Sequence, residues 1–381
     1  TWLPARQAGQ GSGRVDDGVT HFKSCVPAGQ AGKGRKPDRS PSSNSWNKKH
    51  LIKNPNSTQN CYLSRTPDIT CNAIRQDRQF CMTSISPLST LSRLLITGQD
   101  RAKYLHNFCT NEIKALPSGQ AVEAFFCDVR ARVIAHGYVL AFDDRHEFWM
   151  LGGDEATVQQ HLKRYIIMED VAVSSATGDS TASVAIGDTA VATLLKLTTA
   201  ESSVFSEPLR CADVEIPHLD NTKKAVALSV TWANTAMLWL VGASAGIADA
   251  DQSQFERLRI RERFPIINQD MTSDNMAPEA ERNGSAVSYV KGCYLGQEPI
   301  ARLDAMGHVN RALRCVQSSA KPDEFLQVTI LTADGSTAGV VTSSASNDNG
   351  SIGLALIRSN ATQGPLHCVI NGQDIAVTID R

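Results

Sequence analysis

The segment at residues 289–302 holds the residue types best suited to chemistry, in the order YVKGCYLGQEPIAR. Glycine permits positive φ angles and close backbone approach, so Gly292 and Gly296 can fold the chain tightly around Cys293. A nearby positive charge favours the thiolate form of a cysteine, and Lys291 stands two residues earlier. We therefore predict a turn that presents Cys293 as a functional thiol. From the residues alone, a buried structural thiol stays equally open.

Three polar side chains follow the cysteine within one or two helical turns. They are an amide (Gln297), a carboxylate (Glu298) and a guanidinium (Arg302). This set can hydrogen-bond a polar ring and an acidic tail, because it combines donors and acceptors with a bidentate cation. The segment is therefore a candidate binding site as well as a candidate thiol site.

The string KGCYLGQE at 291–298 resembles the K-G-C-Y-x-G-Q-E motif of the YgfZ family, folate-binding relatives of the glycine-cleavage aminomethyltransferase. Further segments resemble that family in the same order along the chain. They are GQDRAKYLHNFCTNEIKAL, the DVRAR turn at 128–132, PEAER near residue 278 and AGVVTSS with SIGLALIR near residue 338. The resemblance covers residues 85 to 381.

The resemblance implies an α+β fold, with a discontinuous folate-binding unit like that of the aminomethyltransferase and then a C-terminal β-barrel. It implies tetrahydrofolate as cofactor, and iron–sulfur client or assembly proteins as partners. Cys293 and Lys291 would carry the chemistry. The cofactor-binding candidates are Gly292, Tyr294, Gly296, Gln297, Glu298, Arg302, Arg259, Glu262 and Glu279.

Three positions depart from the pattern of the family and its relative. In RIRER at 259–263, Arg261 stands where the aminomethyltransferase has its folate-ring carboxylate, and Glu262 substitutes only if the helix register shifts. Ala131 replaces a glycine, which matters if positive φ is required there. The catalytic aspartate of the aminomethyltransferase falls at Ala135 or His136, so the alternative function, tetrahydrofolate-dependent aminomethyl transfer, is disfavoured.

The ten cysteines include no C-x-x-C pair and no spacing typical of a zinc site, so we predict no metal centre. One thiol cannot hold a cluster that takes four thiolates, so Cys293 would act transiently or with ligands from a partner. A third interpretation, a binding module without catalysis, stays open. We expect the other cysteines to be small buried hydrophobic residues, as in most intracellular proteins.

Charge is divided unevenly along the chain, although the formal net charge is only −1. Residues 1–81 carry thirteen Lys and Arg against five Asp and no Glu, and they lack apolar periodicity. We interpret them as a disordered extension that precedes a native start at Met82, or alternatively as a mitochondrial transit peptide. Without a strong global field or a long apolar run, we expect no nucleic acid or membrane partner and a cytoplasmic location.

Apolar patterning predicts the main elements of two domains. The resemblance implies that these are a folate-binding domain over 82–310 and a barrel over 311–381. Strands are predicted near 91–98, within 121–142, at 146–153 and over 171–188, with helices after Asp100, after Asp154 and over 253–264. The last helix stops at Pro265 and buries Phe255, Leu258 and Phe264, while its arginines face solvent. Short strands after residue 310 suggest a small closing β-barrel or a sandwich.

Overall fold

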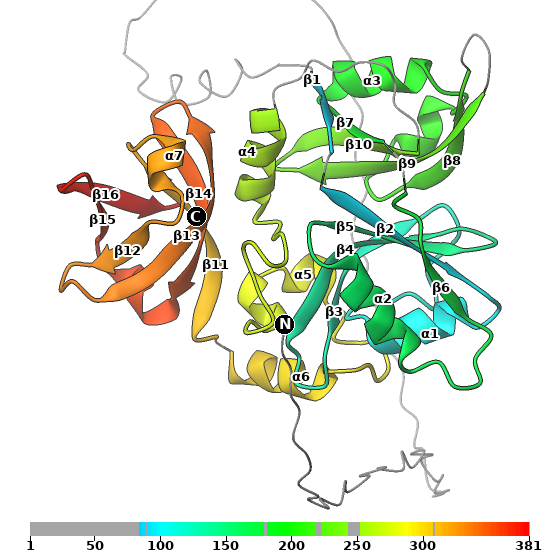
Figure 1. Ribbon diagram of the computed structural model, residues 1–381, viewed down its shortest axis with the longest axis horizontal. Coiled ribbons are helices and arrows are strands. Elements are labelled where there is room, and N and C mark those ends of the chain that lie inside the picture. Colours follow the sequence, from blue (N-terminus) through cyan, green and yellow to red (C-terminus); the bar gives the residue numbers. More distant parts are fainter. Residues whose placement is uncertain are drawn as a thin grey trace, which may run out of the picture. The chain divides into compact units, whose positions relative to one another are not determined.

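The computed structural model describes residues 84–88, 90–178, 181–217, 222–242, 252–307 and 309–380. The expectations about residues 1–81 and a start at Met82 lie outside this part of the chain. The described residues form two antiparallel sheets with helices and a closed barrel, which confirms the predicted α+β class (Figure 1). No helix among them is long and apolar enough to cross a membrane.

The first sheet has the strand order β3-β4-β5-β2-β6. Its strands are β2 (Leu91–Thr97), β3 (Ala121–Cys127), β4 (Val133–Ala141), β5 (His146–Leu151) and β6 (Ala172–Ser175). The long apolar stretch predicted as one or two strands is two, because the chain turns at 128–132. This turn is the one that later contacts the cysteine motif.

The second sheet has the strand order β1-β7-β10-β9-β8. Its strands are β1 (Ser84–Pro87), β7 (Ala182–Ile186), β8 (Cys211–Ile216), β9 (Lys223–Trp232) and β10 (Thr235–Val241). Strand β1 pairs with β7, while the whole first sheet lies between them in sequence. The predicted discontinuous unit is therefore present.

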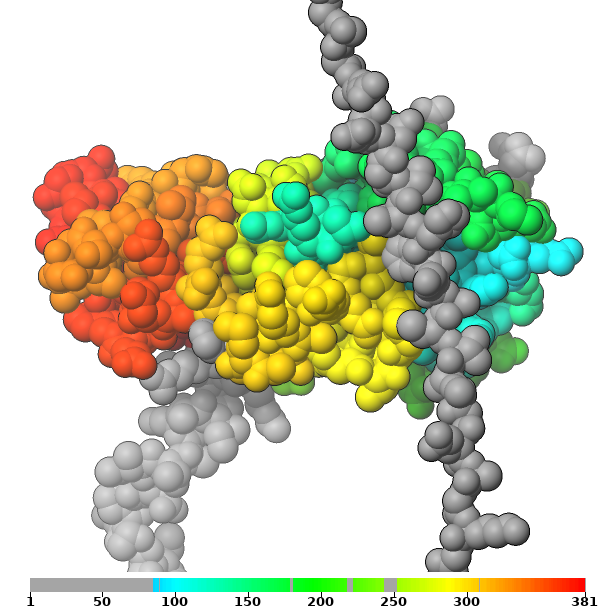
Figure 2. Space-filling model, turned by 90° about the horizontal axis from the view of Figure 1, so that it is seen from below, coloured from blue at the N-terminus to red at the C-terminus, as the bar shows by residue number. Residues whose placement is uncertain are grey.

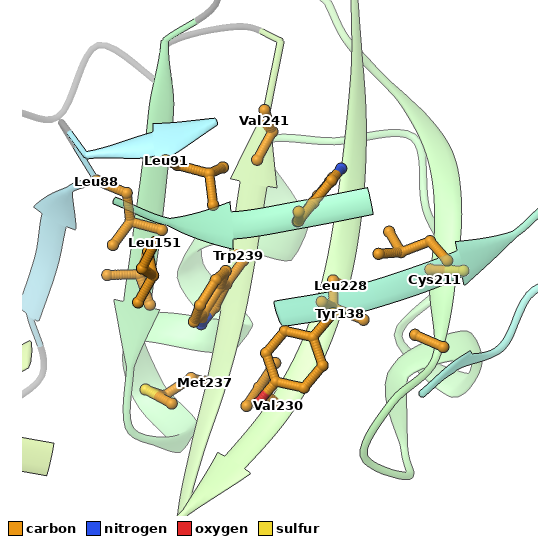
Figure 3. Close-up of a cluster of buried hydrophobic side chains, with 14 of the residues drawn as sticks. Leu88, Leu91, Tyr138, Leu151, Cys211, Leu228, Val230, Met237, Trp239 and Val241 are labelled. Carbon is orange, nitrogen blue, oxygen red and sulfur yellow. The ribbon is translucent and has the colours of Figure 1, made fainter. Parts of the chain in front are cut away.

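A hydrophobic cluster joins the two sheets. Figure 3 shows Tyr138 and Leu151 of the first sheet packed with Leu228 and Trp239 of the second. Nε1 of Trp232 also donates a hydrogen bond of 2.9 Å to the Tyr138 hydroxyl. Burial of one such large apolar side chain contributes about 1.5 to 3 kcal/mol, so this cluster makes the two sheets one folding unit.

The helices are short and lie against the two sheets and the barrel (Figure 1). They are α1 (Arg101–Phe108), α2 (Glu155–Lys163), α3 (Asp188–Lys196), α4 (Gln252–Glu262), α5 (Asn283–Ala286), α6 (Gln297–Met306) and α7 (Pro322–Phe325). Asp154 caps α2 as predicted, because its carboxylate accepts a 3.1 Å hydrogen bond from the Ala156 N–H. The predicted inner residues Phe255, Leu258 and Phe264 are all buried.

Two details of these helices differ from the predictions. Asp100 makes no side-chain cap to α1. Its Oδ2 instead accepts a hydrogen bond of 3.0 Å from the Asp170 N–H, because the loop before β6 lies beside the helix start. Arg259 of α4 is fully buried rather than facing solvent. Its guanidinium pairs with Glu256 of the same helix and with Asp270, which the fold brings to it.

The C-terminal residues form a closed six-stranded barrel in the order β11-β14-β13-β12-β15-β16. The strands are β11 (Arg311–Ser318), β12 (Thr329–Thr332), β13 (Thr337–Asn347), β14 (Gly350–Arg358), β15 (Leu366–Ile370) and β16 (Gln373–Ile379). The predicted barrel is confirmed, although β11 was not among its predicted strands. Closure pairs this strand with both β14 and β16, so the barrel leaves no free edge there.

Candidate thiol site

Three segments far apart in the sequence meet at the cysteine motif. The Leu295 N–H donates to the Asn107 carbonyl at the end of α1, at 2.9 Å. The Ser288 N–H donates to the Thr110 carbonyl, also at 2.9 Å. On the other side, Gly296 lies against the turn between β3 and β4. Three of the segments that carry the family resemblance thus assemble into one place, on the face that Figure 2 shows with α6 in yellow.

Only glycine fits at position 296, because of its backbone conformation and its close neighbours. Its φ of 82° is left-handed, and a Cβ there would lie 2.5 Å from the Asp128 carbonyl oxygen. The motif backbone therefore approaches the turn as closely as only glycine allows. Ala131 in that turn has φ 61°, so the position where the family has glycine does adopt the left-handed conformation. For an L-residue this conformation costs roughly 1 to 2 kcal/mol.

Cys293 is exposed, whereas the other five cysteines of the described chain are buried. Burial raises the pKa of Cys109 and Cys368, and raises the pKa of Cys211 and Cys315 to about 12. Since the thiolate is the reactive form, these buried thiols are inert at neutral pH. Their expected role as core residues is confirmed, and Cys293 is the accessible thiol among the described cysteines.

Lys291 does not project freely beside the thiol. Its Nζ donates to three carbonyl oxygens, those of His106 at 2.6 Å, Cys109 at 2.8 Å and Asn111 at 2.6 Å. The ammonium also lies 4.9 Å from the centre of the Tyr294 ring. Burial lowers the pKa of Lys291, and the three carbonyls satisfy all its donors. The Lys291 side chain therefore holds the motif against the 106–111 segment through these hydrogen bonds.

Two residues, His106 in that segment and Glu112 directly after it, were missed by sequence reasoning. His106 is buried, with 9% of its surface exposed, and its Nδ1 lies 3.0 Å from Oε1 of Glu112. Its Nε2 would lie 3.9 Å from a Cβ placed on Gly292. No periodic pattern marks these residues, because His106 lies in the last turn of α1 and Glu112 follows in a loop.

A buried polar network lies behind the motif. Glu123 of β3 accepts from Nη2 of Arg282 at 2.6 Å and pairs with Nε2 of His136 at 2.8 Å. Burial alone would raise the pKa of Glu123, but the bonds to Arg282 outweigh it and hold the pKa at about 2. The Asn111 amide donates to the Glu123 carbonyl at 2.9 Å, which connects this network to the carbonyl bound by Lys291.

Glu262 lies at the other end of this network. Its Oε1 is 3.3 Å from Nη2 of Arg282, its Oε2 accepts from the Ala233 N–H at 3.0 Å, and 28% of the side chain is exposed. Arg263 has φ 56°, as a glycine at the end of the family pattern would. The helix register is therefore not shifted, and exposed Arg261 occupies the position of the ring carboxylate. Glu262 lies beside that position.

The remaining candidates are dispersed. Arg259 bonds Asp270 and Ser343 inside the molecule, and buried Glu279 accepts from the Asn275 amide at 2.8 Å. Tyr294 is buried, whereas Glu298 and Arg302 lie exposed on α6 and Gln297 begins that helix. Among the described residues, no group of three His, Cys, Asp or Glu side chains could hold a metal ion.

Comparisons with known proteins agree with this architecture. Residues 71–235 match the GCVT N-terminal domain family, and residues 311–381 match the CAF17 C-terminal beta-barrel domain. The chain also resembles the crystal structure of glycine cleavage system aminomethyltransferase T from Bartonella henselae, with a TM-score of 0.64. That alignment covers 78% of this chain and 85% of the other at 13% identity, which shows a shared fold.

Two relatives carry the name tRNA-modifying protein YgfZ. The protein of Colwellia psychrerythraea is 22% identical over 308 residues, which cover 78% of this chain and 91% of the relative. The protein of Yersinia enterocolitica serotype O:8 is 31% identical over 256 residues, which cover 63% of this chain and 72% of the relative. By this similarity and its two matched domains, the chain belongs to the YgfZ family.

Proposed function

We propose that the protein is a tetrahydrofolate-binding accessory protein in iron–sulfur cluster assembly or repair, with Cys293 as its working thiol. The observation that carries the proposal is the exposure of Cys293 in a turn built from three distant segments. The fold holds the other described thiols inside. An accessory role would make any effect on tRNA indirect, through a client enzyme.

Glu262 fits the cofactor better than the other acidic candidates do. The ring N–H groups of a pterin are donors, which suits a carboxylate because it only accepts. A carboxylate has about four lone-pair sites, and Ala233 and Arg282 leave some of those on Glu262 free. Glu279 is buried against Asn275, and Glu298 lies on the surface of α6. Because the helix register is not shifted, Glu262 does not take the place of the family carboxylate itself. It would hold the ring from the neighbouring position, with the acceptor sites that Ala233 and Arg282 leave free.

The test uses cells that lack their own YgfZ relative, with the activity of an iron–sulfur enzyme as the readout. The parent protein should restore that activity, and Cys293→Ala should not. Ala305→Ser, an exposed change on α6, is the control and should restore activity fully. Equal melting temperatures of the purified variants would show that the fold is intact. Full restoration by Cys293→Ala would contradict the proposed thiol role.

Aminomethyl transfer is the alternative, and the geometry disfavours it. Ala135 and His136, which hold the place of the catalytic aspartate, are each about 1% exposed. His136 is bound to Glu123 and stacks on the Phe125 ring at 4.3 Å between centroids. Neither presents a carboxylate to a ligand. Turnover in a glycine-cleavage assay with the partner proteins would support the alternative.

A further inference from the structure

A cavity outside the thiol site lies at the edge of the interface between the two sheets. Its volume is about 210 Å³, and its charged lining residues are Arg93, Arg145, Glu147, Asp213 and Lys224. A water molecule takes up about 30 Å³ in the liquid, so the cavity has room for about seven waters or one small molecule. The length of β9, about 30 Å for its ten residues, separates Lys224 from the Ala233 N–H that binds Glu262. The cavity is therefore a separate site, and it is too small for tetrahydrofolate.

The charged side chains of this cavity are held in fixed positions. Glu147 is buried, and it accepts hydrogen bonds from Nε of Arg93 at 2.9 Å and from Nε of Arg145 at 2.8 Å. Nε1 of Trp149 donates to the same carboxylate at 2.9 Å. Asp213 accepts from Nη1 of Arg145 at 3.1 Å and from Nη2 at 2.5 Å. Both guanidinium groups are thus oriented before a ligand arrives, which lowers the entropic cost of binding one.

One positive charge of the lining is left over. Three cationic side chains face two carboxylates, and the two carboxylates are paired with the two arginines. In the described part of the chain, neither Nη1 of Arg93 nor Nζ of Lys224 has a hydrogen-bond or ion-pair partner. Hydrogen bonds from such charged donors to an oxyanion are short and strong. The charge of the cavity therefore fits an anion with a single negative charge.

The remaining walls of the cavity are largely apolar. They include the side chains of Leu95, Ala176, Ala225, Val226 and Val241. Val241 also belongs to the hydrophobic cluster between the sheets, as Figure 3 shows. An inorganic anion would leave these walls in contact with water, whereas a short hydrocarbon chain would remove apolar surface from water on both sides. The walls therefore favour an organic anion over phosphate.

We propose that this cavity binds a small aliphatic carboxylate, of about the size of butyrate. Its carboxylate accepts hydrogen bonds from Nη1 of Arg93 and Nζ of Lys224, and its hydrocarbon chain lies against Leu95, Val226 and Val241. No residue of the thiol site takes part. The proposal is thus independent of the proposed function, and either can fail without the other.

Calorimetric titration of the full chain with sodium butyrate, at constant ionic strength, tests the proposal. The parent protein should give a saturable heat. Lys224→Gln should weaken binding at least about tenfold, because it removes one of the two free cations. Lys223→Gln is the matched control, since successive side chains of a strand point to opposite faces and Lys223 does not line the cavity. Both lysines are exposed, so neither change should affect folding.

Two further titrations test the position and the chemical class of the ligand. Ala176→Leu fills the cavity without changing its charge, so it should abolish the saturable heat with butyrate. Sodium phosphate should bind the parent protein at least about tenfold more weakly than butyrate. The proposal would be overturned by no saturable heat with butyrate, by equal affinities of Lys224→Gln and Lys223→Gln, or by unchanged binding to Ala176→Leu. Phosphate binding as tight as that of butyrate would overturn the assignment of an aliphatic carboxylate.

Discussion

At the scale of single residues, the sequence identifies the thiol but not what surrounds it. Cys293 could be singled out because its neighbours form a specific motif. The targets of Lys291 could not, because His106 lies 185 residues earlier. From the sequence, a lysine two residues before a cysteine is expected to stabilise the thiolate by its positive charge. The fold instead directs that charge to three carbonyls, which only the assembled structure brings together.

Replacement of Lys291 by methionine tests this bracing role. The variant keeps the length of the side chain but leaves three buried carbonyls without their donor. Hydrogen bonds to charged groups contribute about 1.5 to 3 kcal/mol each, so we expect a loss of about 3 kcal/mol in the free energy of unfolding. Urea denaturation measures it. Lys163→Met, at an exposed position of α2, should cost little, and equal effects would contradict the account.

His146 makes stability depend on pH. Neither ring nitrogen has a partner among the described residues, and burial, followed by the charge of Arg101, lowers its pKa from 6.5 to about 4. Between these values the unfolded chain binds a proton that the folded chain does not. Stability is therefore lost as pH falls from 6.5 towards 4, by about 3 kcal/mol in total.

His146→Phe should remove this contribution, because phenylalanine cannot be protonated. Urea denaturation at neutral pH and again near pH 4.5 would show a smaller loss in the variant than in the parent. Identical losses would mean that other groups carry the acid sensitivity. Glu123 and His136 are present in both proteins, so their titration cancels in this comparison.

At the scale of elements, most helices and strands follow from apolar periodicity, but their contacts do not. The strands on either side of 128–132 and the helix after Asp154 were predictable from local pattern alone. The contact between that turn and Gly296 depends on tertiary packing, which no local pattern encodes. Strand β11 was not predicted, because Arg311 and Arg314 interrupt its apolar pattern.

Two glycines of α6 make a matched test of that contact. Gly296 and Gly307 flank the helix with φ of 82° and 71°. Alanine at either position should lower the free energy of unfolding by about 1 kcal/mol, because its backbone must adopt the left-handed conformation. At Gly296 its Cβ would also meet the Asp128 carbonyl oxygen at 2.5 Å, whereas no described neighbour lies within 4 Å of a Cβ at Gly307.

We therefore expect Gly296→Ala to lower the free energy of unfolding by about 3 kcal/mol and Gly307→Ala by only about 1 kcal/mol. Thermal denaturation of the two purified variants gives the comparison. The alkylation rate of Cys293 should change in Gly296→Ala alone, because only that variant displaces the motif from the turn. Similar stabilities of the two variants would show that the turn at 128–132 can move to make room for a side chain at position 296.

At the scale of the whole molecule, a buried ion pair ties α4 to the barrel. Nη1 of Arg259 lies 2.6 Å from Oδ2 of Asp270, and Nη2 donates to the Ser343 hydroxyl of β13 at 2.6 Å. The sequence predicted a solvated arginine because charged residues dominate the helix. Glu256 of the same helix is one partner, but Asp270 comes from a loop and Ser343 from the barrel, and these two contacts follow only from the fold.

Arg259→Met should cost about 3 to 5 kcal/mol, because it leaves the Asp270 carboxylate buried without its cation. Asp270→Asn in the same chain should recover part of that loss, since the uncompensated charge disappears. Urea denaturation of the two single variants and the double variant gives the coupling energy. Additive losses in the double variant would mean that the pair does not hold the barrel to α4.

The central claim is that this YgfZ-family chain binds tetrahydrofolate, with Glu262 as the ring carboxylate. Calorimetric titration with tetrahydrofolate tests it most directly. The parent and Glu215→Gln, an exposed change on β8, should give the same saturable heat, whereas Glu262→Gln should bind at least about tenfold more weakly. No saturable heat with the parent protein would contradict the claim, and equal affinity in Glu262→Gln would refute the assignment of the carboxylate.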